Sequence, residues 1–309
     1  MIIEKITSTT SQKGYAARVV PIELIYEINK DFQKLNDNQL LDPDIRDNVA
    51  NVYMCDFANI PFSVKSVIVT ASPCYITKVY FNWEGKRIPL IMPPTYMDYM
   101  DKPNEIKKDL QEILADNNYH IEIAWLPGKM IAAKSRLSQY GKNNITYIPG
   151  MGSFALLTTY YSDLPCNESN WDDITMMERC KTCNACIKNC PTGAISHDRF
   201  LVKAERCLTY HNEFSDAKEF PTWINPSAHN SIVGCMHCQT CCPVNSKYLD
   251  NIVELDEFNA DETEWIAQGI PISELPSETI EKLERIKVIN FYDKLTRNIK
   301  ALLKNFLKF

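Results

Sequence analysis

Residues 180 to 191 read CKTCNACIKNCP, and this stretch decides how the C-terminal half of the chain must fold. Two residues separate Cys180 from Cys183 and Cys183 from Cys186, and three separate Cys186 from Cys190, which directly precedes a proline. Thiolates at this spacing can reach three irons of one cubane 4Fe-4S cluster from a tight loop, while the fourth points away toward a second cluster. One such run therefore predicts further cysteine ligands elsewhere in the chain.

The further ligands are present. Residues 235 to 243 read CMHCQTCCP, and Cys207 stands alone between the two motifs. The crossed arrangement of two-cluster ferredoxins then assigns one cluster to Cys180, Cys183, Cys186 and Cys242, and the other to Cys190, Cys207, Cys235 and Cys238. Cys241 is an alternative to Cys242, which we favour because it precedes a proline as Cys190 does. Structural zinc is the competing interpretation, but eight cysteines in this order favour iron–sulfur clusters.

Composition supports a metal-binding protein rather than a disulfide-bonded one. Nine of the twelve cysteines lie between Cys180 and Cys242, and the chain of 309 residues has no export signal at Met1 to Ser8. Cys55, Cys74 and Cys166 lack ligand-like neighbours, so we assign them no role. The net charge of −6 argues against a surface built mainly for phosphate backbones. We expect a cytoplasmic protein without stable membrane insertion.

The fold class expected is α+β: an α/β-type domain followed by a ferredoxin-like double 4Fe-4S domain. Helical periodicity marks residues 21–36, 103–116 and 129–137, and strand-like runs cover residues 65–72, 76–83, 87–92, 119–125, 144–149 and 153–161. From Cys166 the texture changes to short segments with Cys-Pro pairs. The expected domains are 1–165 for cofactor and substrate, 166–255 for the clusters and 256–309 for a helical tail.

The tail is basic and amphipathic. Residues 280 to 309 hold eight Lys or Arg against three acidic residues. The apolar residues at helical spacing are Ile286, Phe291, Leu295, Ile299, Leu302 and Phe306. Packing of this apolar face on the domain is the favoured interpretation, and docking on a partner, RNA or a membrane surface is the alternative.

Several short motifs give the chain a resemblance to a known family. They are Lys65-Ser66-Val67-Ile68-Val69, Gly141-Lys142-Asn143, Gly152-Ser153-Phe154, Ser162-Asp163-Leu164-Pro165, Pro191-Thr192-Gly193-Ala194-Ile195, Arg206-Cys207-Leu208-Thr209-Tyr210 and Cys242-Pro243-Val244-Asn245. In this order they resemble the epoxyqueuosine reductases, which are cobalamin-dependent iron–sulfur enzymes related in architecture to reductive dehalogenases. The resemblance covers roughly residues 15 to 250 and is most specific in the cysteine-rich part.

The resemblance implies an oxidoreductase in which two clusters reduce a bound cobalamin to Co(I), which in turn reduces epoxyqueuosine in tRNA or another small group. An upstream ferredoxin or flavodoxin would supply the electrons. Cobalamin would meet Gly141, Lys142, Asn143, Gly152 and Ser153.

The resemblance also implies a proton donor. An ungapped count places Glu122 at the family's acid, although a two-residue slip would place Ala124 there, and Tyr140 is a competing donor. Two functions from other classes remain open: an electron-transfer protein without its own corrin, and a reductive activator of a partner corrinoid protein.

Overall fold

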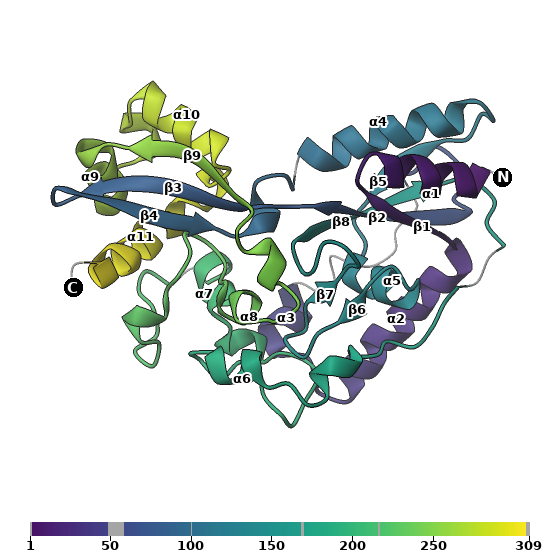
Figure 1. Ribbon diagram of the computed structural model, residues 1–309, viewed down its shortest axis with the longest axis horizontal. Coiled ribbons are helices and arrows are strands. Elements are labelled where there is room, and N and C mark those ends of the chain that lie inside the picture. Colours follow the sequence, from purple (N-terminus) through teal and green to yellow (C-terminus); the bar gives the residue numbers. More distant parts are fainter. Residues whose placement is uncertain (1, 49–58, 100, 168–169, 216, 307–309) are drawn as a thin grey trace. The chain divides into compact units, whose positions relative to one another are not determined.

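The computed structural model describes residues 2–48, 59–99, 101–167, 170–215 and 217–306, and the chain divides into two compact units. The first unit comprises Met1–Cys74 and Asp98–Cys183, and the second comprises Tyr75–Met97 and Asn184–Phe309. The mixed α and β architecture followed by a cysteine-rich region agrees with the expected fold class. The two units are described separately below (Figure 1).

A four-stranded antiparallel sheet forms the centre of the first unit, in the order β1-β2-β8-β5. The strands are β1 Ala16–Pro21, β2 Ser66–Pro73, β5 Ile121–Ala124 and β8 Ala155–Ser162. The first seven residues of β2 are all buried, because alternate side chains pack on opposite faces. Val67 and Val69 pack on one face, and Ile68 packs on the other. This explains why the strand contains only apolar and small polar residues in its buried part.

Helices cover both faces of this sheet (Figure 1). α2 (Ile22–Asp37) and α5 (Gly128–Lys134) bury Ile25, Ile28 and Ile131 in one core, while α1 (Ile2–Gln12) and α4 (Asp101–Ala115) contribute Ile6 and Leu110 to the other. A short helix, α3 (Pro43–Asn48), follows α2. The helices expected at 21–36, 103–116 and 129–137 therefore correspond to α2, α4 and α5, whereas α1 and β1 were not anticipated.

A three-stranded sheet in the order β4-β3-β9 organises the second unit. β3 (Ile76–Trp83) and β4 (Lys86–Met92) form a hairpin, and β9 (Ile252–Phe258) pairs with β3 in parallel, Ile76 opposite Ile252. This pairing corrects the expected continuous boundary at residue 165. Residues 75–97 belong with the C-terminal part, because two of their strands share a sheet and a core with it.

The C-terminal helices pack on one face of that sheet. They are α9 (Ala260–Gln268), α10 (Ser277–Arg285) and α11 (Tyr292–Phe306). Leu295, Ile299 and Leu302 of α11 are buried in the same core as Phe81 of β3. The favoured interpretation of the tail, packing of its apolar face, is thus correct for the described residues. The segment is part of the second unit, not a separate domain.

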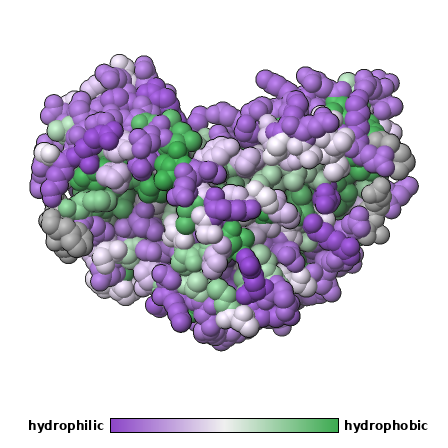
Figure 2. Space-filling view, viewed as in Figure 1, coloured by the Kyte–Doolittle hydropathy of each residue, from purple (hydrophilic) through white to green (hydrophobic). Residues whose placement is uncertain are grey.

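The other face of the three-stranded sheet is polar along much of its length. Glu254 accepts hydrogen bonds from Tyr80 at 2.7 Å and Lys78 at 3.3 Å, and Arg87 pairs with Glu257 at 2.9 Å. Figure 2 nevertheless shows hydrophobic side chains at the surface over β3 and β9. Ile252 and Val253 of β9 are exposed to solvent. Within the part of the chain that the structure describes, every helix is too short or too polar to cross a bilayer.

Candidate iron–sulfur and cofactor site

A small hairpin carries the Gly-Lys-Asn motif in the first unit. β6 (Gln139–Tyr140) and β7 (Thr146–Tyr147) pair in antiparallel fashion, and the amide of Gly141 donates to the carbonyl of Ile145 at 2.8 Å. A β-carbon added to Gly141 would stand only 2.5 Å from Cε2 of Tyr147, so a larger residue would force the ring to move. The close packing of Tyr147 requires glycine here.

Asn143 and Lys142 are both engaged within the first unit. The buried Asn143 amide donates to the Tyr147 hydroxyl at 2.9 Å. The half-buried Lys142 ammonium donates to the carbonyl oxygen of Cys183 at 2.8 Å. A second link runs from the amide of Met177 to the carbonyl of Tyr140, also at 2.8 Å. These two hydrogen bonds join the motif to the loop that carries the first two cysteines.

The first cysteines lie at the end of the first unit. Cys180 closes a short 3-10 turn, Glu178–Cys180, and its amide donates to Met177 at 2.9 Å. In the second unit Cys186 lies on α6 (Ala185–Asn189), and Cys238 lies on α8 (His237–Thr240). These two short helices pack on each other. Their cysteines come together through the fold although about fifty residues separate them in the chain.

Three cysteines of the second predicted cluster influence one another electrostatically. Burial, with contributions from Cys207 and Cys190, raises the pKa of Cys235 to about 12. Burial likewise raises the pKa of Cys207, with Cys190 contributing. Such coupling requires the three sulfurs to be near neighbours. Because thiols in this setting resist deprotonation, the energy of metal–sulfur bonds is needed to hold them as thiolates.

Cys190 differs from these two thiols. Burial alone would raise its pKa, but hydrogen bonds from the backbone of Ile195, Thr192 and Ala194 and from the Thr192 hydroxyl outweigh burial and lower it. The Cys-Pro-Thr-Gly-Ala-Ile turn therefore aims amide groups at this sulfur. Amide hydrogen bonds to cysteine sulfur are one of the means by which proteins stabilise and tune iron–sulfur clusters.

The closing Cys-Pro-Val-Asn motif is a tight turn. The amide of Asn245 donates to the carbonyl of Cys242 at 2.9 Å, and its fully buried side chain donates to Gln239 at 2.9 Å. Cys241 and Cys242 are both half-buried, so the preference for Cys242 stays a prediction. Among the described residues, no three Cys, His, Asp or Glu side chains converge as single-ion ligands do. Cubane ligands bind different irons, so they lie farther apart than zinc ligands.

Glu122 and Tyr140, the two predicted proton donors, have different surroundings. The Glu122 carboxylate accepts a hydrogen bond from Lys107 of α4 at 2.6 Å, and its side chain is 41% exposed. Tyr140 is buried, and burial raises its pKa well above the usual range of a phenol. Two residues earlier, the buried Ser138 hydroxyl has no hydrogen-bond partner among the described residues. The chain therefore has a buried hydroxyl without a hydrogen bond two residues before Tyr140.

Sequence reasoning missed a second group of polar residues, in the second unit. Tyr96 donates a short hydrogen bond to Glu213, the last residue of α7 (Leu208–Glu213), which begins directly after Cys207. Neither residue belongs to a motif that resembles the family, and Tyr96, in the 3-10 turn Pro94–Tyr96 after β4, is far from the cysteines in sequence. Only the three-dimensional pairing of β3 with β9 brings it into this unit.

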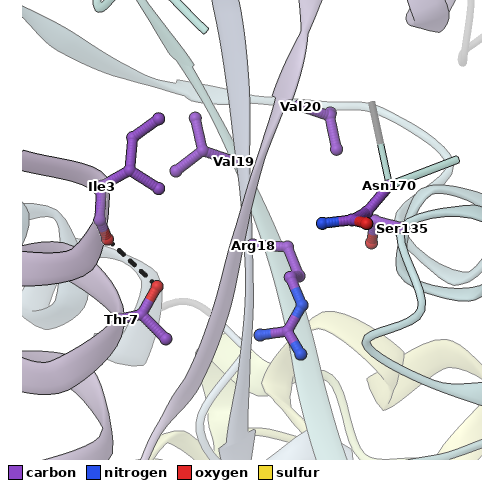
Figure 3. A pocket seen from close by; sticks show the side chains of 7 residues that line it. All are labelled: Ile3, Thr7, Arg18, Val19, Val20, Ser135 and Asn170. Carbon is purple, nitrogen blue, oxygen red and sulfur yellow. Dashed lines mark hydrogen bonds between the residues drawn. The ribbon is translucent and has the colours of Figure 1, made fainter. Parts of the chain in front are cut away.

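A pocket of about 220 Å³ lies in the first unit, lined by Ile3, Thr7, Arg18, Val19, Val20, Ser135 and Asn170 (Figure 3). The hydroxyls of Thr7 and Ser135 donate to the backbone of Ile3 and Ala132. None of the predicted site residues lines it, and its volume is below the range of about 300–1,000 Å³ typical of small-molecule sites. It is not the predicted cofactor site.

Comparison with known proteins defines the class first. Residues 179–245 match the family model of the 4Fe-4S double cluster binding domain. This segment contains all eight predicted ligands, Cys180 to Cys242, in the order described above. The chain is therefore an iron–sulfur protein with a domain for two 4Fe-4S clusters. Cys55 lies outside the described residues, and Cys74 and Cys166 are buried thiols outside the matched segment.

The particular resemblance is to epoxyqueuosine reductases, in sequence and in fold. The enzyme of Synechocystis sp. is 26% identical over 176 residues, which is 55% of this chain and 59% of the relative. The structure of the enzyme from Streptococcus thermophilus superposes with a TM-score of 0.69 at 17% identity, covering 99% of this chain and 82% of the other. An epoxyqueuosine reductase with a modified tRNA-Tyr stem loop gives 0.62 at 16% identity, covering 98% and 81%.

Proposed function

We propose that the chain is an oxidoreductase of the epoxyqueuosine reductase type, in which two 4Fe-4S clusters deliver electrons to a cobalamin that reduces the substrate. The observation that carries the proposal is the double-cluster domain joined to a first unit whose motif hairpin braces the cysteine loop. A bare two-cluster carrier would not need the first unit. The ligand sets are those assigned from the cysteine spacing.

The substrate class follows from the relatives. One solved epoxyqueuosine reductase carries an epoxyqueuosine-modified tRNA stem loop, so we infer that this chain acts on the same base in tRNA. Reduction of an epoxide to an alkene takes two electrons and two protons, and the oxygen leaves as water. Each 4Fe-4S cluster passes one electron at a time, and two clusters can hold the required pair.

Cobalamin would supply a cobalt centre that can store low-potential electrons and pass them to an organic substrate. The first unit offers it polar capacity at the buried Ser138 hydroxyl, beside Tyr140. Gly150 adds backbone in a left-handed conformation, with φ of 84°, and open space where its β-carbon would be. Lys142 and Asn143 hold the surrounding loop in shape through the bonds described above. Gly152 and Ser153, which begin the approach to β8, remain predicted contacts.

Of the two candidate donors, we favour Tyr140 as the group that gives a proton to the substrate. Its raised pKa keeps the phenol protonated throughout the neutral range, as a general acid requires. Glu122 instead accepts a hydrogen bond from the Lys107 ammonium at 2.6 Å and is partly exposed to water. A salt-bridged carboxylate on a half-exposed strand is more typical of a structural pair.

The test uses anaerobic protein reconstituted with iron, sulfide and cobalamin, a chemical reductant, and an epoxyqueuosine-containing anticodon stem loop. Mass spectrometry should show the loss of one oxygen atom from the modified base. Tyr140→Phe should lower the turnover by about 10²–10⁴-fold, the usual contribution of a general acid, and Glu122→Gln should keep it. No product with fully loaded protein would reject this substrate, and the reverse pattern in the two variants would return the acid role to Glu122.

A further inference from the structure

Opposite charges lie beside the two sets of predicted cluster ligands. In the first unit the ammonium of Lys142 is 2.8 Å from the carbonyl oxygen of Cys183 and half-buried. It therefore holds a positive charge against the backbone of a ligand of the first cluster. A charge that is partly removed from water acts through a lower effective dielectric than a surface charge and is screened less by salt.

In the second unit a glutamate side chain lies near the segments that carry ligands of the second cluster. Glu213 accepts the short hydrogen bond from Tyr96 and ends the helix that starts after Cys207. Gly234 precedes Cys235 and has φ of 63°, and a β-carbon on it would stand 2.5 Å from the Tyr96 hydroxyl. Tyr96 thus contacts both cysteine-bearing segments, Glu213 at the end of α7 after Cys207 and Gly234 before Cys235.

The electrostatics of Tyr96 agree with this placement. Burial raises its pKa most, Glu213 raises it further, and Cys207 and Cys235 add to the effect. The Tyr96 phenol donates its hydrogen bond to the Glu213 side chain. Asn212, the neighbour of Glu213, donates to the carbonyl of Gly234 at 2.7 Å and fixes the two segments to each other.

From this arrangement we infer that the two clusters have different reduction potentials. Glu213 lowers the potential of the cluster held by Cys190, Cys207, Cys235 and Cys238. Lys142 raises the potential of the cluster that includes Cys183. Reduction adds one negative charge to a cluster, so a nearby carboxylate disfavours it and a nearby ammonium favours it. An electron from an external donor then moves from the lower-potential cluster to the higher. The inference rests on the ligand assignment of the proposed function.

The experiment is a potentiometric titration of the iron-loaded protein without cobalamin or substrate, followed by electron paramagnetic resonance. Two reduction steps at separate potentials are expected. Lys142→Gln should shift only the higher step, downward, and Glu213→Gln should shift only the lower step, upward. Because these substitutions keep hydrogen-bonding capacity while removing charge, merely loosened packing would not shift the two steps in opposite directions.

Matched controls remove exposed charges of the same sign. Lys188→Gln on α6 and Glu219→Gln after α7 change residues that are exposed to solvent, and both should leave the two potentials in place because water and salt screen them. Iron content is measured for every variant. If Glu213→Gln fails to load, Glu213→Asp keeps the charge and should restore both iron and the lower potential.

Coincident steps in the unaltered protein, or variants whose potentials move together or not at all at full iron content, would overturn the inference. Either result would leave the reductase proposal standing, since the titration uses neither corrin nor tRNA. Conversely, if the protein bound no cobalamin, the proposed function would be rejected, but the inferred order of the two reduction potentials would be unaffected. The two failures are therefore distinguishable.

Discussion

The first unit and the cysteine-bearing segment of the second unit are stabilised in different ways. The first unit buries both faces of a four-stranded sheet under helices, with fully buried side chains such as Ile68 and Tyr160. The described residues of the range 184–251 form short helices and 3-10 turns, and a small apolar cluster among them comprises Leu208, Ile224 and Ala228 with a few neighbours. Hydrophobic burial accounts for the first, whereas we expect the second to depend on its metal clusters.

Loss of a cluster ligand gives the largest expected effect. Cys207→Ser should lower the iron content by about half or more, because one cubane loses a thiolate, and should open residues 184–251 to proteases while the first unit resists them. Iron analysis and limited proteolysis followed by mass spectrometry measure both effects. Cys74→Ser, at a buried thiol outside the double-cluster domain, is the control that should keep its iron. Equal protection of both regions in iron-free protein would show that residues 184–251 do not depend on the clusters for their fold.

Removal of a buried charge tests the first unit. Lys134 is 5% exposed and lies 2.9 Å from the Asp31 carboxylate. Lys134→Met leaves that carboxylate without its closest partner, so we expect a loss of about 3 kcal/mol in the free energy of unfolding, with iron content unchanged. Chemical denaturation of the iron-loaded protein measures it. Lys34→Met, at a side chain that is 72% exposed, should change stability by less than about 0.5 kcal/mol.

The two units should also differ in their response to acid. In the second unit, burial, with a contribution from Arg297, lowers the pKa of His229 from 6.5 to about 4. The unfolded chain then binds more protons than the folded one between these values, so stability is fully present above pH 6.5 and falls as the pH drops toward 4. His229→Phe should flatten this loss, which is at most about 3 kcal/mol.

Because of Asp31, the first unit should lose stability at a lower pH than the second unit. Burial alone would raise its pKa, but the hydrogen bonds from Lys134 and Lys34 outweigh it and lower the pKa. Its contribution is therefore present above the ordinary aspartate pKa of about 3.9 and is lost only as the pH falls further. Acid unfolding followed by hydrogen exchange should reach the second unit first. Simultaneous loss of protection in both units would contradict this order.

A surface ion pair provides the smallest effect. Arg285 pairs with Asp256 at 2.6 Å, and the arginine side chain is 53% exposed. Arg285→Ala should lower the free energy of unfolding only slightly, since water screens the pair and holding two long side chains costs entropy. Added salt should reduce the cost further. A much larger loss would show that this pair, and not only the core under α10, holds the helix to β9.

The parts of the fold that sequence predicts are those with a strong local period. The run Lys65–Ser72, rich in β-branched residues, and the amphipathic segment that begins at Pro103 correspond to β2 and α4. β9 was missed because its sequence, Ile-Val-Glu-Leu-Asp-Glu-Phe, has three acidic residues, and the partners of two of them, Tyr80 and Arg87, lie far away in the chain. A strand that depends on distant partners has little local signal.

The candidate site divides in the same way. Cysteine spacing carries ligand geometry directly, so the double-cluster domain was predictable from residues 180–243. The role of Lys142 was not, because its bond to Cys183 depends on a loop that closes over about forty residues. Tyr96 and Glu213 likewise meet only through the hairpin of β3 and β4. Sequence motifs reveal metal ligands better than the groups that surround them.

The presence of two clusters and one cobalamin is tested most directly by the iron, sulfide and cobalt content, with the visible spectrum, of protein made anaerobically with cobalamin supplied. We expect about eight irons and about eight sulfides per chain, together with one cobalt. Iron near four or zinc in place of iron would contradict the two-cluster assignment. About eight irons without cobalt would retain the clusters but make the chain an electron-delivery protein, and would reject the reductase proposed here.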